Sequence, residues 1–320
     1  MNDREDTRLL PPDERGVAEA AALLRHGRLV AFPTETVYGL GADATNGRAV
    51  AAIYDAKNRP RFNPLIVHVP DTAAAERLAV LSPAARSLAE AFWPGPLTLV
   101  LPVREDSGLS DLIRAGHSTV AIRVPANPLA RALLRSVDRP IAAPSANPSG
   151  RLSPTTAQHV LDGLSGRIAA VLDDGACPVG VESTILKPVD GAVHLLREGG
   201  LPAEAVKAMP GMRLIRPGQG ADAPEAPGML VSHYAPRAAL RLNAPAPEKG
   251  EAWLGFGPGP EGENLSRSGD LIEAAANLFS ALHALDAGGP KRIAVAPIPE
   301  TGLGRAINDR LRRAAAPRSG

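Results

Sequence analysis

Three cationic side chains stand close together where a helical run gives way to an apolar strand. Lys57, Arg59 and Arg61 lie in the segment KNRPRFNPLIVH, in which Pro60 ends the helical pattern. In open α/β sheets such connections are where ligands are usually held, and clustered Lys and Arg side chains favour phosphate or carboxylate. Taken alone, the spacing is explained more readily by a solvated basic turn. The prediction of an anion site therefore depends on the segments that accompany it.

Polar residues follow the predicted strand Arg28–Phe32. The loop from Pro33 to Ala44 combines hydroxyl and carboxylate side chains with two glycines. Such a loop suits a small zwitterion or a hydroxyl-bearing substrate, and a capped turn would explain it equally well. Gly39, Gly41 and Ala44 match a GxGxxA pattern, but they stand too far from the strand for a convincing dinucleotide-binding loop.

A second polar loop, residues 144–156, precedes a predicted helix. Ser153, Thr155 or Thr156 can cap that helix and leave backbone N–H groups for a phosphate. Capping does not account for the Ser-Ala-Asn sequence that begins at Ser145. No GxSxG elbow occurs in the chain, so Ser145 is not predicted to be a hydrolase nucleophile.

Two arginines lie within or at the end of predicted strands. Arg123 interrupts the apolar strand Thr119–Val124. Because burying an unpaired cation is costly, we expect it to face a cavity or a partner, with a salt bridge on an edge strand as the competing interpretation. Arg197 follows the strand Val193–Leu196, and the polar run 182–184 begins another strand. Polar strand ends of this kind recur too often for coincidence to be a good account.

The apolar periodicity of the chain predicts an α/β fold. The expected helices are Val17–Arg25, Gly47–Lys57, Ala73–Leu78, Pro83–Trp93, Pro128–Ser136, Ala157–Leu161, Asp270–Leu285 and Gly304–Ala314. The expected strands are Arg28–Phe32, Pro64–Val69, Leu97–Val103, Thr119–Val124, Pro140–Ala143, Ile168–Leu172, Thr184–Pro188, Val193–Leu196, Ala252–Phe256 and Arg292–Pro297. The strand Arg28–Phe32, the helix Gly47–Lys57 and the strand Pro64–Val69 are expected to form a βαβ unit. The strands on either side of residues 189–192 are expected to form a hairpin.

Composition limits the class of protein. The 320 residues are 44% hydrophobic, enough for a sizeable core and, by length, for two domains. A net charge of +1 provides no bulk field toward nucleic acid or membrane. Cys177 is the single cysteine, which excludes an internal disulfide and a multi-cysteine zinc site. The polar N-terminus and the absence of a long apolar run predict a cytoplasmic protein without a membrane span.

Six segments together resemble the YrdC-like family, and their order and spacing resemble its longer members, the threonylcarbamoyl-AMP synthases. They are PTETVYGLG (33–41), KNRP…NPL…H (57–68), TVAIRVP (119–125), PSANPSGRLSPT (144–155), GVESTI (180–185) and LREG (196–199). The resemblance implies a nucleotidyltransferase that makes threonylcarbamoyl-AMP from L-threonine, bicarbonate and ATP and releases pyrophosphate. The product would serve the N6-threonylcarbamoyl modification of adenosine 37 in tRNA.

The resemblance also implies two groups of binding residues. Those for L-threonine are Thr36, His68, Arg123, Ser145 and Ser183. Those for ATP are Lys57, Arg59, Asn63, Thr119, Asn147, Ser153, Thr155, Arg197 and Tyr234, with Lys57 and Arg59 also in the catalytic role. The residue types suit these roles, because an arginine fork grips a carboxylate and clustered cations neutralise charge on leaving pyrophosphate. Mg²⁺ is expected to accompany the phosphates of ATP, with no metal ligands from the protein.

The same resemblance divides the chain into three parts. Residues 1–212 are expected to form a YrdC-like catalytic domain with a twisted open sheet, 213–240 a linker and lid, and 241–320 a smaller Rossmann-like α/β domain. The segment Gly218–Pro236 is rich in Pro, Gly and Ala, as linkers are. In the family the corresponding segment lies across the active site, with Tyr234 at a nucleotide-contacting position. The family commonly has basic residues before the His-Tyr pair, where this chain has Leu230, Val231 and Ser232.

Two other functions are compatible with a YrdC-like domain. A carbamoyl-transfer enzyme of hydrogenase maturation would need cysteine-rich zinc fingers, which one cysteine excludes in this chain. A non-catalytic RNA-binding or ribosome-assembly protein fits a basic cavity, but near-neutral charge and 3% aromatic residues argue against it. The expected partners are ATP, L-threonine, bicarbonate and downstream tRNA threonylcarbamoyl-transferase proteins. A weak contact with tRNA stays open, and no membrane partner is expected.

Overall fold

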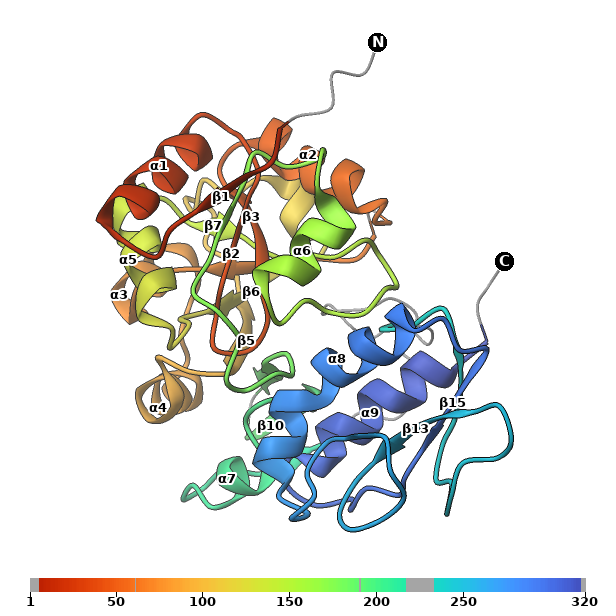
Figure 1. The fold of residues 1–320 in the computed structure, drawn as a ribbon. Coiled ribbons are helices and arrows are strands. Elements are labelled where there is room, and N and C mark those ends of the chain that lie inside the picture. Colours follow the sequence, from red (N-terminus) through yellow and green to blue (C-terminus); the bar gives the residue numbers. More distant parts are fainter. Residues whose placement is uncertain (1–5, 61, 190, 217–232, 318–320) are drawn as a thin grey trace.

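One mixed sheet runs through the N-terminal part of the chain (Figure 1). The computed structural model describes residues 6–60, 62–189, 191–216 and 233–317. Within these residues the strand order is β1-β8-β2-β3-β7-β4-β6-β5-β9-β10-β11. The strands are β1 Arg8–Leu10, β2 Val30–Phe32, β3 Gly39–Asp43, β4 Ile66–His68, β5 Leu97–Pro102, β6 Thr119–Arg123, β7 Ile141–Ala142, β8 Ala170–Leu172, β9 Thr184–Val189, β10 Ala192–Arg197 and β11 Leu214–Ile215.

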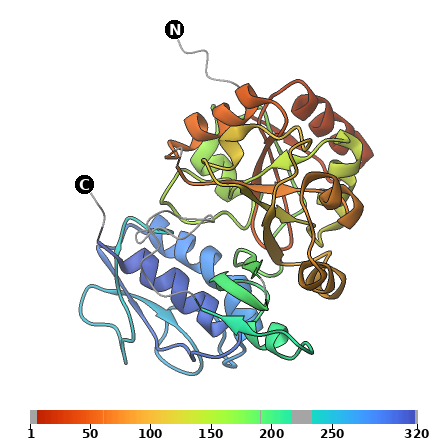
Figure 2. The same ribbon diagram turned by 180° about the vertical axis from the view of Figure 1, so that it is seen from behind.

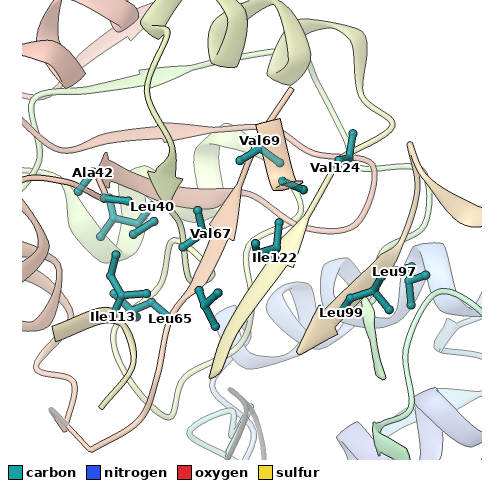
Figure 3. Packing of buried hydrophobic residues seen from close by; sticks show 14 of the residues in the cluster. Leu40, Ala42, Leu65, Val67, Val69, Leu97, Leu99, Ile113, Ile122 and Val124 are labelled. Atoms are coloured by element: carbon teal, nitrogen blue, oxygen red, sulfur yellow. The ribbon is translucent and has the colours of Figure 1, made fainter. Parts of the chain in front are cut away.

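Helices cover both faces of this sheet. On one face lie α1 (Glu14–Arg25) and α5 (Pro128–Val137), and on the other lie α2 (Gly47–Lys57), α3 (Thr72–Leu78), α4 (Pro83–Phe92) and α6 (Ala157–Leu164). The remaining elements are the 3₁₀ turn η1 (Asp111–Ile113) and α7 (Ala203–Lys207). Val30 and Phe32 of β2 pack with α1 and α5, whereas Ala31 packs on the opposite side, as the two-residue period of a strand requires. On the same side as Ala31, Val67 of β4 and Ile122 of β6 are neighbours in the hydrophobic core (Figure 3).

Side-chain caps fix where the helices begin. Asp13 accepts a hydrogen bond from Gly16 N at the start of α1, and Asn46 accepts from Arg48 N at the start of α2. Asn127 caps α5 in the same way. Each cap satisfies a backbone N–H that has no partner within the helix. Helix α2 ends at Asn58, which takes a left-handed conformation with φ 50°, and this turn directs the chain toward the cationic segment.

A second, smaller sheet belongs to the C-terminal part. Its strands are all parallel, in the order β12-β15-β13-β14, with bounds β12 Ala239–Arg241, β13 Ala252–Gly255, β14 Glu263–Asn264 and β15 Arg292–Val295. The long helices α8 (Leu271–Ala287) and α9 (Gly304–Ala315) lie side by side between this sheet and the first domain (Figures 1 and 2).

The two sheets are joined by buried apolar side chains. Val37, Leu152 and Val181 of the first domain belong to the same hydrophobic cluster as Phe279 of α8 and Ile307 of α9. Because an apolar interface of this kind is not readily exposed to water, the second domain is seated firmly on the loops of the first domain that carry these three residues. No helix in the described ranges is long and apolar enough to cross a membrane.

The predicted α/β fold with a smaller second α/β unit is confirmed, and so is the hairpin, formed by β9 and β10. Two expectations were wrong. Residues 39–43 form the strand β3, where a loop was expected. The βαβ unit therefore begins with β3 and not with the predicted strand Arg28–Phe32, because β2, which lies in that range, is antiparallel to β3. Glycine weakens strands, but here Gly39 and Gly41 leave room for the Phe32 ring. The second sheet also begins earlier than Ala252, at β12. The domain boundaries at 212 and 240 stay predictions.

Candidate active site

The segment after α2 is positioned by its own backbone. Arg59 N donates to Tyr54 O across the left-handed turn at Asn58, so the chain doubles back at the end of the helix. Lys57 Nζ then donates to the carbonyl oxygens of Ser145 and Asn147, which ties α2 to the second polar loop. Burial, with the neighbouring Arg59 charge, lowers the pKa of Lys57 well below its ordinary value.

The Arg59 guanidinium is buried beside the same segment. Its Nη2 donates to Pro64 O at 3.0 Å and its Nε to Asn63 O at 3.4 Å. Burial lowers its pKa to about 10. Within the described ranges neither Lys57 nor Arg59 forms an ion pair with a carboxylate, and both amide atoms of the buried Asn63 side chain have no hydrogen-bond partner. Buried cations and an unsatisfied amide are costly in the absence of a ligand, so this corner is suited to an anion. Arg61 lies outside the described residues.

The last residues of two parallel strands form the next part of the site. His68 of β4 and Arg123 of β6 are paired in register. Arg123 Nη1 donates to Thr36 Oγ1 at 2.8 Å, and Nη2 lies 2.7 Å from Glu35 Oε1 in a buried ion pair. Glu35 in turn accepts a hydrogen bond from Ala126 N at 3.0 Å. These contacts fix the guanidinium plane. The partner expected for Arg123 is thus a buried carboxylate, that of Glu35.

His68 is neutral in this setting. Burial, together with the Arg123 charge, lowers its pKa to about 3, and its Nδ1 has no hydrogen-bond partner in the described part of the chain. Its ring meets the Phe32 ring edge to face, with centroids 6.0 Å apart. His68 can therefore offer a ligand a neutral hydrogen-bonding nitrogen.

The β9–β10 hairpin contributes Ser183 and Arg197. Arg197 Nη2 donates to Ser183 O at 2.7 Å, and Ser183 Oγ lies 2.7 Å from Thr98 Oγ1 of β5. Gly199 allows this close packing, because a Cβ there would lie 2.3 Å from Glu182 O and 2.4 Å from Thr184 N. The hydroxyl and the cation at these two strand ends are thus held by backbone contacts.

Glu182 lies between the two domains. Its Oε1 accepts from Ser153 Oγ at 2.5 Å, and its Oε2 lies 2.7 Å from Nε of Arg310, which belongs to α9 of the second domain. Burial alone would raise the pKa of Glu182, but the charges of Arg310 and Arg197 and these hydrogen bonds lower it to about 2. Glu182 is therefore ionised throughout the physiological range.

His233 and Tyr234 resume the described chain after residue 216 and lie in the same site. The Tyr234 side chain is buried against the Phe279 ring of α8, with centroids 5.8 Å apart, and its backbone takes the uncommon value φ 61°. Burial lowers the pKa of His233 to about 3.

These elements enclose one cavity. Its walls come from both polar loops, three strand ends and the pair 233–234; they include Arg59, His68, Arg123, Ser145, Ser183, Arg197 and Tyr234 among the predicted residues, and Thr34, Glu182 and His233 besides. The free space is about 50 Å³, enough for one or two water molecules. In the described ranges no group of three His, Cys, Asp or Glu side chains could hold a metal ion.

The other predicted residues lie behind or away from the cavity wall. Thr36, Lys57, Asn63 and Ser153 contact wall residues through the bonds described above, and Asn147 accepts from Lys57. Thr155 bonds Ser280 of α8 at 2.9 Å, which places its hydroxyl at the contact between the domains. Thr119 begins β6, at the opposite end from Arg123. The binding roles of all these residues stay predictions. The proposed lid, Gly218–Pro236, falls outside the described residues except for 233–236, and Leu230, Val231 and Ser232 lie outside them.

Three charged residues that hold the cavity wall in place were not predicted from the sequence. Glu35 and Glu182 stood in segments already noted as polar, but no pattern linked them to arginines 88 and 128 positions away. Arg310 was covered only as part of the predicted helix Gly304–Ala314. A fully buried arginine in that helix could not be distinguished from its exposed neighbours by spacing alone.

Comparisons with known proteins cover both domains. Residues 22–199 match the family Sua5_yciO_yrdC, described as "Telomere recombination", and residues 201–316 match "Threonylcarbamoyl-AMP synthase, C-terminal domain". A threonylcarbamoyl-AMP synthase of Bacillus subtilis is 43% identical over 96% of this chain and 94% of its own length. One from Pyrococcus abyssi is 42% identical over 94% of both.

Solved structures agree with this. The crystal structure of P. abyssi Sua5 complexed with L-threonine superposes on 97% of this chain, and on 97% of its own, with a TM-score of 0.88 and 39% identity. E. coli YciO, at 21% identity, covers 61% of this chain and 96% of its own with a TM-score of 0.55, a likeness of fold.

Proposed function

This chain belongs to the family of Sua5, YciO and YrdC proteins, and on that premise we propose that it is an enzyme, the nucleotidyltransferase L-threonylcarbamoyladenylate synthase. It would convert L-threonine, bicarbonate and ATP into threonylcarbamoyl-AMP and pyrophosphate. The observation that carries the proposal is the charge arrangement of one cavity. There Arg123, preoriented and with hydroxyls around it, lies close to Lys57 and Arg59, two buried cations that form no ion pair with a carboxylate in the described part of the chain.

The Arg123 end of the cavity suits an amino acid. The guanidinium is held by Glu35 and Thr36, so a substrate carboxylate meets a donor that needs no reorganisation. Ser145 and Ser183 provide hydroxyls in the same wall, and His68 provides a neutral nitrogen. This set matches the carboxylate, ammonium and hydroxyl of threonine.

The Arg59 corner suits the triphosphate of ATP. Lys57, Arg59 and Arg197 are buried cations, and a polyphosphate would balance the charges of Lys57 and Arg59, which have no carboxylate partner in the described chain. Asn63 adds an amide without a partner in the described chain. Since ATP is far larger than the present cavity, residues 233 and 234 would have to move before it binds.

The proposed chemistry needs positioning more than covalent help. The amine of threonine adds to bicarbonate with loss of water, and the product is a carbamate. A carbamate oxygen then attacks the α-phosphorus, the bond to the bridging oxygen breaks, and pyrophosphate leaves with the electron pair. Lys57 and Arg59 would stabilise the charge that grows on pyrophosphate, and the cavity would hold two like-charged reactants together.

Magnesium would come with the nucleotide. Glu182 lines the cavity and Glu35 holds Arg123 of its wall, and each already pairs with an arginine, so they do not form a free oxygen cage. The phosphate oxygens of ATP and water are the ligands that Mg²⁺ would use.

Three further proposals follow from this function. The adenylate would pass to downstream tRNA threonylcarbamoyl-transferase proteins in the cytoplasm, and a weak tRNA contact is compatible with the near-neutral charge. Residues 1–212 would be catalytic, 213–240 would link and cover, and 241–320 would form the second domain. The buried position of Tyr234 in the cavity wall supports a covering role for the end of that link.

The decisive experiment measures pyrophosphate release by the purified full chain. Release is expected with ATP, threonine and bicarbonate together, with threonylcarbamoyl-AMP detected by mass spectrometry. Leaving out threonine should abolish it. Equal release without threonine would show that the cavity hydrolyses ATP by another route and would refute the proposal.

A further inference from the structure

We propose that Arg310, on helix α9 of the second domain, is a positioning residue of the synthase site, where it fixes the Glu182 carboxylate and the Tyr234 ring in the cavity wall. The proposal rests on the proposed function and assigns the second domain a part in it. Arg310 does not line the cavity itself. It would act through two side chains that do.

The contact with Glu182 is buried on both sides. Arg310 is 1% exposed and Glu182 is 6% exposed. Arg310 Nε lies 2.7 Å from Glu182 Oε2, and Nη1 lies 2.6 Å from Asp309 Oδ2 on the same helix. The guanidinium is thus oriented by one carboxylate from its own domain and presented to one from the other domain. Such a pair holds a single geometry, because separating it would leave a charge buried and unpaired.

The contact with Tyr234 uses the flat face of the same group. Arg310 Cζ lies 5.1 Å from the centre of the tyrosine ring, within the range of a cation–π contact. Tyr234 holds a left-handed backbone conformation that a non-glycine residue adopts only when its surroundings stabilise it. The second domain contributes a cationic contact to that ring through Arg310 and an aromatic contact through Phe279.

Glu182 transmits the position of Arg310 to the rest of the wall. Its other oxygen accepts from Ser153, and its neighbour Ser183 bonds Arg197 and Thr98. The titratable and charged groups around Glu182 are therefore Arg310, Arg197, His233 and Tyr234, and Ser153 donates a hydrogen bond to it. Arg310 Nη2 is buried without a hydrogen-bond partner in the described chain, so the guanidinium is held for its placement at some cost.

The test compares four full-length variants with wild type. Arg310→Met removes the charge and keeps much of the volume. Arg310→Lys keeps the charge and loses the flat face. The double variant Arg310→Met with Glu182→Gln removes both charges of the inter-domain pair, while Asp309 keeps its ion pair with Arg313. Arg312→Met is the matched control, because Arg312 lies on the same helix, exposed, and pairs with Glu300.

Pyrophosphate release is measured against ATP concentration and against pH. Arg310→Met should raise KM for ATP by roughly 10- to 100-fold, because a shift of about 1 Å in a positioned group can cost that much. It should also add an ionisation to the acidic side of the pH profile, since burial then opposes a charged Glu182 with one arginine fewer. Arg310→Lys should keep the wild-type pH profile and show an intermediate KM. Arg312→Met should match wild type.

The double variant decides the case if Arg310→Met does not fold. It should lack the added ionisation and keep a raised KM for ATP, because Tyr234 is still unsupported. A wild-type KM in the double variant would overturn the proposal. So would an activity loss in Arg310→Met that is uniform over pH with an unchanged KM, since that describes a merely structural residue. Wild-type release that does not depend on threonine would instead refute the proposed function, so the two failures are distinguishable.

Discussion

Gly180 lies in a loop of the first domain that packs against helix α8 of the second domain. It is buried, with φ 72°, and a Cβ there would lie 2.3 Å from Ala275 O and 2.5 Å from Ala276 Cα of α8. Both obstacles are helix backbone, which cannot turn aside as a side chain can. Gly180→Ala should therefore force the loop away from α8.

Gly175, in the same loop, is a matched control. It has φ 73°, is exposed, and a Cβ there would meet nothing within 4 Å. The left-handed conformation costs an alanine about 1–2 kcal/mol at either position. Overpacking adds about 1–3 kcal/mol at Gly180 alone. We expect a loss of about 1–2 kcal/mol for Gly175→Ala and of about 2–5 kcal/mol for Gly180→Ala.

The assay is equilibrium unfolding in urea, followed by fluorescence. Trp93 lies in the first domain and Trp253 in the second, so the emission reports on both. Pyrophosphate release is measured in parallel, because Gly180 stands two residues before Glu182 and a displaced loop should lower activity only in Gly180→Ala. Equal losses of stability and equal activities in the two variants would refute the inferred close packing of loop and helix.

Three further predictions concern the cavity. Arg59→Ala should lower pyrophosphate release by about 100-fold or more in a folded protein, because it removes a buried charge from the proposed phosphate corner; Arg48→Ala, an exposed arginine of α2, is the control, and equal rates would contradict the role. Arg123→Lys should raise KM for threonine by roughly 10- to 100-fold, since an ammonium cannot replace the two-pronged guanidinium, and an unchanged KM would show that the carboxylate binds elsewhere. Burial lowers the pKa of His68 and of His233 to about 3, so the folded chain keeps both neutral while the unfolded chain takes up protons near pH 6.5. Lowering the pH from 7 to 5 should therefore reduce the free energy of unfolding by about 2 kcal/mol for each of these two histidines. His68→Gln should reduce that fall by the same amount in urea unfolding, and an identical fall would contradict the neutral assignment.

Local sequence determined most of the helices and strands. The caps at Asp13, Asn46 and Asn127, and the left-handed turn at Asn58, are readable as residue types at fixed positions, because a cap satisfies backbone groups only a few residues away. The six ordered segments identified the family, because each is a short run of residues that can be read directly from the sequence. Strand β3 was not predicted, because glycines at 39 and 41 argue against a strand unless the Phe32 ring that packs on them is known.

Tertiary structure decided how the charges pair. Lys57 was assigned to ATP, which stays a prediction, and the sequence did not show that its side chain also reaches the carbonyls of Ser145 and Asn147, 88 and 90 residues away. Glu35 with Arg123 and Glu182 with Arg310 are pairs of the same kind. The sequence by itself determined which side chains are available and where elements begin and end, since those depend on neighbours along the chain. Which cation meets a carboxylate, and which is left for a ligand, depends on strand order and on the seating of the second domain. A buried ion pair is set by distances of a few ångströms between residues that the sequence holds far apart.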